Sequence, residues 1–152
     1  MRETVRVCVP RFLQVGKGSL EHVSEILAMI GGASHPLIVT DKVMVEHGVA
    51  DRVRDCLARN DIHCGVYDGT TPDPTDEVVH AGVAALNEGS HDSVIGLGGG
   101  SPLDAAKAIA VMAKHGTNLL DYRPPQEFNT PGLPMVAIPT TAGTGSEVTH
   151  HS

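Results

Sequence analysis

The chain has few aromatic residues, few basic residues and no long hydrophobic run. It contains no tryptophan, two tyrosines and two phenylalanines among 152 residues. Proteins that bind single-stranded nucleic acid stack bases on aromatic side chains, and duplex DNA and anionic membranes attract basic surfaces. With 11 Lys and Arg against 18 Asp and Glu, the formal net charge is -7. We therefore expect neither nucleic acid nor a membrane as a partner.

Cysteine and targeting signals are equally sparse. The three cysteines, Cys8, Cys56 and Cys64, form no C-x-x-C pair, which fits reduced thiols better than a disulfide framework or a thiolate metal site. The first ten residues, MRETVRVCVP, lack the apolar core of a secretory signal and the Arg- and Ser-rich helix of a transit peptide. We expect a cytoplasmic protein, and the length corresponds to one domain.

Short apolar segments alternate along the chain with amphipathic helical ones. We expect strands at 36–40, 62–67, 93–97 and 134–138, and helices at 19–30, 43–47, 51–57, 75–87 and 101–115. Such alternation is typical of right-handed βαβ units. It predicts an α/β fold with a Rossmann-like, mostly parallel sheet and flanking helices. The alternating residues 4–9, followed by Arg11–Val15, add an N-terminal β-ribbon to this prediction.

Ligands of open parallel sheets bind beyond the carboxyl ends of the strands, so the residues after each strand are the first candidates for chemistry. After the third expected strand comes the segment GLGGGSPLD at 96–104. Glycines let a backbone approach a pyrophosphate closely, and the first N–H groups of the following helix attract anions. Gly98, Gly99 and Gly100 are therefore candidates for a phosphate site. The same residues also fit an ordinary tight turn between a strand and a helix.

The start of the following helix carries its own signals. Ser101 is expected to cap the helix, Pro102 to occupy its first helical position, and Asp104 to complete an S-x-x-D capping pattern. A second segment, PTTAGTGSE at 139–147, follows the last expected strand and is rich in hydroxyls and glycine. It fits a surface loop, but it also predicts that two loops at neighbouring strand ends converge on one ligand.

Together these segments closely resemble one known family. GLGGGSPLDAAKAIA at 96–110 and PMVAIPTTAGTGSEVT at 134–149 are similar to the iron-containing (group III) alcohol dehydrogenases. Weaker agreement runs through GKGSL at 16–20, VTD at 39–41 and Asp121-Tyr122. The resemblance implies that residues 1–152 form a dinucleotide-binding domain with the fold of the N-terminal domain of dehydroquinate synthase.

The resemblance also assigns roles to residues. Gly98, Gly99, Gly100 and Ser101 would hold the pyrophosphate of a nicotinamide dinucleotide, with Asp104 on the same helix turn. Thr140, Thr141, Thr144 and Ser146 would line its nicotinamide side. Asp41 would face the adenosine ribose, where a carboxylate accepts from a 2′-OH and repels a 2′-phosphate, so NAD is expected rather than NADP. The alternative for Asp41 is a helix N-cap.

Family members hold iron or zinc through one Asp and three His in a C-terminal helical domain, which this chain is expected to lack because it stops at Ser152. The scattered histidines show no metal-ligand spacing, so no metal site is expected here. The resemblance then implies the cofactor-binding part of an enzyme that transfers hydride between a small alcohol or aldehyde and NAD. It also implies a homodimer. Two alternatives remain: a non-catalytic nucleotide-binding or assembly module, and a related maleylacetate-type reductase.

Overall fold

The computed structural model describes residues 10–31, 33–116 and 131–148. Their centre is a parallel sheet in the order β2-β1-β3-β4. Its strands are β1 (Pro36–Val39), β2 (Gly65–Tyr67), β3 (Ser93–Gly98) and β4 (Met135–Pro139). Each neighbouring pair is parallel, with Ile38 opposite Ile95 and Ile95 opposite Val136. The predicted strands are confirmed, although β2 is shorter than the apolar run that indicated it.

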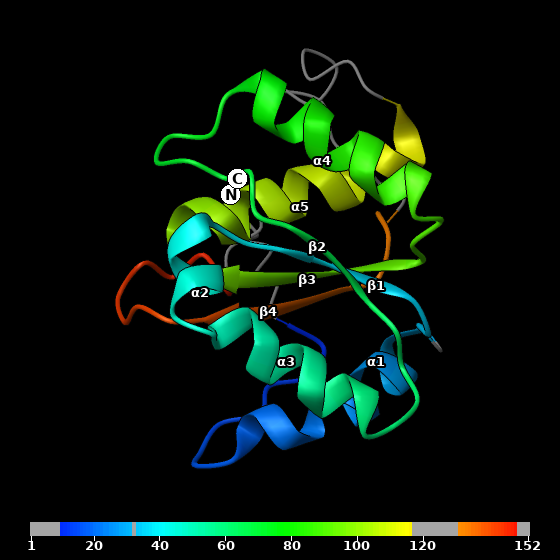
Figure 1. The fold of residues 1–152 in the computed structure, drawn as a ribbon, viewed down its shortest axis with the longest axis vertical. Coiled ribbons are helices and arrows are strands. Elements are labelled where there is room, and N and C mark those ends of the chain that lie inside the picture. Colours follow the sequence, from blue (N-terminus) through cyan, green and yellow to red (C-terminus); the bar gives the residue numbers. More distant parts are fainter. Residues whose placement is uncertain (1–9, 32, 117–130, 149–152) are drawn as a thin grey trace, which may run out of the picture.

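Helices cover both faces of this sheet, giving three layers (Figure 1). They are η1 (Ser19–His22), α1 (Val23–Gly31), α2 (Lys42–Glu46), α3 (Val49–Ala58), α4 (Asp76–Glu88) and α5 (Gly100–His115). Helices α1 and α3 lie on one face, and α4 and α5 lie on the other. The α/β prediction with flanking helices is confirmed. None of the helices in the described ranges is long and apolar enough to cross a membrane.

Alternation along the strands builds a separate apolar core on each face. Ile38 and Ile95 pack with Leu57 of α3 beneath the sheet, whereas Leu37 and Val94 pack with the residues of α4 and α5 above it. All six residues of β3 are buried. A central parallel strand covered on both faces is expected to read as a continuous apolar run, which is why periodicity located it well.

Two local predictions near the N-terminus differ from the structure. Arg11–Val15 forms no strand, and the other half of the predicted β-ribbon, residues 4–9, lies outside the described residues. Ser19 does not cap the first helix, because the N-cap is Gly18, in the left-handed conformation at φ 85°. The Ser19 hydroxyl instead donates to the Gly16 carbonyl at 2.6 Å. A left-handed glycine turn therefore starts this helix in place of a side-chain cap.

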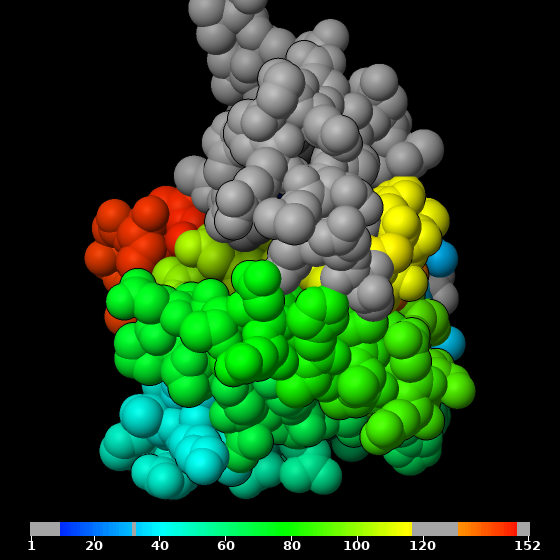
Figure 2. Space-filling model, turned by 90° about the horizontal axis from the view of Figure 1, so that it is seen from above, coloured from blue at the N-terminus to red at the C-terminus, as the bar shows by residue number. Residues whose placement is uncertain are grey.

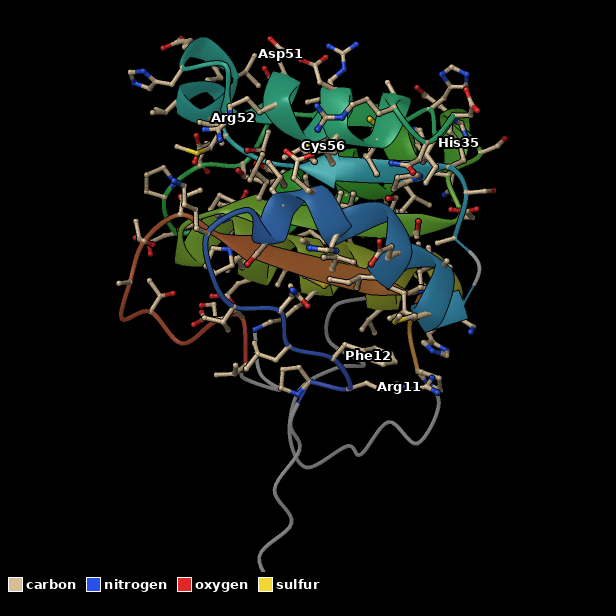
Figure 3. The ribbon with its side chains drawn as sticks, turned by 90° about the horizontal axis from the view of Figure 1, so that it is seen from below. Arg11, Phe12, His35, Asp51, Arg52 and Cys56 are labelled. Carbon is tan, nitrogen blue, oxygen red and sulfur yellow. The ribbon has the colours of Figure 1, made fainter. Side chains whose placement is uncertain are left out.

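A polar cluster closes the end of the sheet where the strands begin, marked by His35 in Figure 3. The Asp92 carboxylate accepts from the backbone N–H groups of Ser34 and His35 and from the hydroxyls of Ser34 and Ser93, at 2.7–3.0 Å. Burial raises the pKa of Asp92, but these hydrogen bonds outweigh it and leave the pKa below 3.8. Burial, and then repulsion from the charge of the neighbouring His35 ring, whose centroid lies 4.3 Å away, hold the pKa of His91 below its ordinary 6.5.

This cluster predicts a loss of stability in mild acid. The unfolded chain takes up a proton at His91 near pH 6.5, whereas the folded protein resists it, so stability falls as the pH drops below that value. Asp92 acts in the same direction below pH 3.8. In thermal melts between pH 7 and pH 5, His91→Gln should show a smaller drop in Tm than the wild type. The same change at exposed His63 should leave the drop unchanged, and equal slopes for all three proteins would contradict the prediction.

Candidate functional site

The strand order places a topological switch point between β1 and β3. The chain leaves β1 toward β2 on one side and leaves β3 toward β4 on the other, so the connections diverge between these two neighbours. Open α/β sheets bind ligands at such a switch point, beyond the carboxyl ends of the strands. Asp41 follows β1, Gly98 ends β3 and Thr140 follows β4. The three predicted segments therefore meet at one end of the sheet, on the left in Figure 1.

Gly98 makes the sharp turn from β3 into α5. Its φ is +141°, and a Cβ there would lie 2.8 Å from Pro102 Cγ. Only glycine adopts this backbone conformation without strain. Helix α5 then begins at Gly100, with Gly99 as its N-cap. The first N–H groups of an α-helix have no intrahelical partner, so those of this turn are available to an anion.

The predicted capping pattern of this helix is wrong. No side chain caps α5. Because the helix begins at Gly100, Ser101 is its second residue rather than its cap, and Pro102 is its third residue rather than its first. The turn at Gly98 brings the backbone into the helix earlier than the Ser-Pro signal indicated. Asp104 consequently makes no capping hydrogen bond. Its carboxylate contacts Lys107 Nζ at 3.1 Å and Ser146 Oγ at 3.4 Å.

The second predicted segment, Thr140–Ser146, lies directly against the glycine turn, and we call it the hydroxyl loop. The Thr140 N–H donates to the Gly98 carbonyl at 2.8 Å. Thr141 Oγ1 lies 3.2 Å from where a Cβ of Gly99 would be, and Ser146 Oγ lies 3.4 Å from that of Gly100. In Figure 2 the orange-red loop adjoins the yellow-green start of α5.

The hydroxyl loop combines exposed and buried side chains. Thr140, Thr141 and Thr144 are exposed, whereas Ser146 is buried at 7% exposure. Gly143 and Gly145 have φ values of +100° and +71°, so both sit where glycine is favoured. A loop that lay only on the surface would leave the Ser146 hydroxyl exposed, whereas here Ser146 is buried and contacts Asp104 of α5. The two loops thus lie together in the fold, and their convergence on one ligand stays a prediction.

Asp41 lies beside the glycine turn and also caps α2. Its Oδ1 accepts from the Met44 N–H at 2.9 Å, so the alternative of a helix cap is confirmed. The other oxygen, Oδ2, lies 3.6 Å from the Cβ position of Gly98. Since a carboxylate has two oxygens, the cap uses one and leaves the second directed at the glycine turn. The capping role and a role toward a ligand are compatible.

The sequence did not predict the contacts of three further residues in this region. The buried Thr40 hydroxyl donates to the Leu97 carbonyl at 2.8 Å, and the Thr70 hydroxyl donates to the Thr40 carbonyl at 2.6 Å. These bonds tie the ends of β1 and β3 to the loop after β2. Lys107 is the partner of Asp104 on α5. The i, i+3 spacing of Asp104 and Lys107 is visible in the sequence, whereas the two threonine bonds join residues that are 57 and 30 positions apart.

The described ranges contain no set of side chains suited to bind a metal ion. Groups of three or more His, Cys, Asp or Glu side chains that could hold a metal ion do not occur there. The described residues therefore do not fit a catalytic iron or zinc, which needs at least three protein ligands. The pair of neighbouring His150 and His151 lies outside these ranges.

The sequence of residues 10–152 matches the family described as "Iron-containing alcohol dehydrogenase". The chain belongs to this family. A relative from Geobacillus thermodenitrificans, "Long-chain-alcohol dehydrogenase 1", is 40% identical over 151 residues, which cover 97% of this chain and 38% of the relative. The family resemblance of the two glycine-rich segments is thereby confirmed.

Solved structures agree with the family assignment. A structure of 1,3-propanediol oxidoreductase superposes with a TM-score of 0.91 at 33% identity and covers 97% of this chain. A sulfoacetaldehyde reductase from Bifidobacterium kashiwanohense, solved in complex with NAD+, superposes with a TM-score of 0.83 at 30% identity. This chain covers 38% and 39% of those two chains. It therefore spans less than half the length of the iron-containing alcohol dehydrogenases that it matches.

Proposed function

We propose that this chain is the NAD-binding part of an iron-containing alcohol dehydrogenase that transfers hydride between a small alcohol or aldehyde and the nicotinamide. The observation that carries the proposal is the meeting of three elements at the switch point of the sheet. They are the glycine turn, the hydroxyl loop and the free oxygen of Asp41. The NAD+ complex of the related sulfoacetaldehyde reductase supports the choice of cofactor.

Different residues would bind different parts of the dinucleotide. The N–H groups at the start of α5, at Gly99, Gly100 and Ser101, would hold the pyrophosphate, because helix N-termini favour negative charge. The bare backbone of Gly98, Gly99 and Gly100 leaves room for its close approach. Thr140, Thr141 and Thr144 would offer hydroxyls to the nicotinamide and its ribose. Bound NAD supplies the acceptor or donor of the hydride.

Asp41 would bind the adenosine side of the dinucleotide. Its second oxygen would accept from the 2′-OH of the ribose and repel a 2′-phosphate. The metal of the family would be held by parts of the longer relatives that this chain does not cover. The homodimer remains a prediction, and sedimentation of the purified protein tests it.

A titration of the 152-residue chain with NADH tests the proposal. Binding is expected to shift or quench NADH fluorescence with weak affinity, because the chain covers only 38% of such relatives as the long-chain alcohol dehydrogenase. Alcohol oxidation is expected to be absent with NAD, iron and zinc added. Turnover under those conditions would overturn the assignment of the metal to the uncovered part. A complete lack of NADH and NAD binding would overturn the proposed function and favour an assembly role.

Asp41→Ser is expected to shift the preference toward NADPH. Serine is also a good N-cap, so α2 keeps its acceptor while the negative charge is removed. The ratio of NADPH to NADH affinity should rise about tenfold, which corresponds to about 1.4 kcal/mol. Fluorescence titrations with both cofactors measure this ratio. An unchanged ratio, in a variant with an unchanged Tm, would show that Asp41 is a cap alone.

A further inference from the structure

We propose that Asp104 and Ser146 form a clasp that holds the hydroxyl loop over the glycine turn, so that both are positioning residues rather than contacts of the cofactor. This inference rests on the proposed NAD site. Sequence resemblance places both residues among the cofactor contacts, but the structure joins them to each other. Asp104 lies one helical turn beyond Gly100 on α5, and Ser146 closes the hydroxyl loop.

Both oxygens of the Asp104 carboxylate are engaged. Oδ2 accepts from the Ser146 hydroxyl at 3.4 Å, and Oδ1 accepts from Lys107 Nζ at 3.1 Å. The Lys107 side chain is only 16% exposed. A carboxylate held in this way is a poor ligand for a pyrophosphate, because like charges repel. It is well suited to bind a hydroxyl, because hydrogen bonds to charged groups are the stronger ones.

The clasp lies at the far end of the hydroxyl loop. Its near end is joined to the glycine turn by the bond from the Thr140 N–H to the Gly98 carbonyl. Between these two attachments lie the exposed Thr141 and Thr144, together with Gly143 and Gly145. Glycines give a loop many alternative conformations. A second attachment therefore raises the fraction of molecules whose hydroxyls face the site, and the apparent affinity rises with that fraction.

A double-mutant cycle on NADH binding tests the clasp. Ser146→Ala and Asp104→Asn are each expected to weaken NADH binding about threefold, because the contact of 3.4 Å is longer than a strong charged hydrogen bond. The double variant should bind no more weakly than the weaker single variant, because Ser146→Ala removes, and Asp104→Asn weakens, the same contact. Ser146→Thr, which keeps the hydroxyl, should recover most of the affinity. Additive losses, about tenfold in the double variant, would show two independent cofactor contacts and overturn the clasp.

A positioning role can be separated from a general structural one. ADP engages the Asp41 and glycine-turn side of the site, so its affinity should change less than about twofold in both single variants. Equal losses for ADP and NADH would mean that the site as a whole is disturbed. Asp51→Asn is the matched control, because Asp51 pairs with Arg54 at the same i, i+3 spacing and the same 3.1 Å on α3. Figure 3 places Asp51 on the helix α3, on the opposite face of the sheet from α5.

Hydrogen exchange makes the clasp testable without the cofactor. Backbone amides of the hydroxyl loop should exchange faster in Ser146→Ala and Asp104→Asn than in the wild type, while those of β3 remain protected. If the wild-type chain fails to bind NADH but loop exchange rises, the clasp stands and the proposed function falls. If NADH binds and exchange in the loop is unchanged by either substitution, the clasp is overturned and the NAD site stands.

Discussion

The Gly98→Val variant is expected to bind NADH about a hundredfold more weakly than the wild type. Gly98 has a φ of +141°, and a Cβ there would lie 2.8 Å from Pro102 Cγ. A β-branched residue is strained in this turn, and keeping it in the native conformation costs about 1–3 kcal/mol. That cost lowers the fraction of molecules that can bind NADH. The apparent Kd rises by the factor by which this fraction falls. Fluorescence titration with NADH measures it.

Gly16 offers a matched control for this substitution. It has nearly the same φ, +139°, but no atom lies within 4 Å of its Cβ position, and it lies before η1 rather than at the switch point. Gly16→Val should therefore carry a comparable backbone strain and leave the Kd for NADH unchanged. If both variants bind NADH like the wild type, the glycine turn is not the pyrophosphate site. If both lose affinity equally, the effect comes from reduced stability.

Leu103→Ala is expected to lower the free energy of unfolding by about 2–5 kcal/mol. Leu103 is fully buried in the first turns of α5, and its Cδ2 lies 3.1 Å from the Cβ position of Gly96 on β3. Removing the side chain leaves a cavity where the helix packs on the central strand. The loss is large beside the 5–15 kcal/mol typical of a whole domain. Urea denaturation followed by circular dichroism measures it.

Leu13→Ala is the control for that loss, because Leu13 is 71% exposed. The same change of side chain there should alter the free energy of unfolding by less than about 0.5 kcal/mol. A cost at Leu103 no larger than the cost at Leu13 would mean that α5 is not anchored on β3 as the structure has it. The comparison depends on the packing of α5 and is independent of any cofactor.

Hydrophobic periodicity located most of the fold because burial itself is periodic. β3 is covered on both faces, so its six residues are all buried, and the matching apolar run is visible in the sequence. β2 is less buried, and its apolar run, 62–67, overstated its length. Arg11–Val15 has apolar residues but forms no strand, because a strand also requires a partner that local sequence does not specify.

The candidate site shows the same difference between what local sequence determines and what packing decides. The sequence alone determined which residues could serve: Gly98 because only glycine tolerates its turn, and the threonines because their hydroxyls follow a strand. Only the tertiary structure decided how they are used. It placed Ser101 inside α5 and joined Asp104 to Ser146, 42 residues away. Conformational preference belongs to a residue and its neighbours, and can be read locally. Contacts between distant segments depend on how the helices and strands pack, and so appear only in the folded chain.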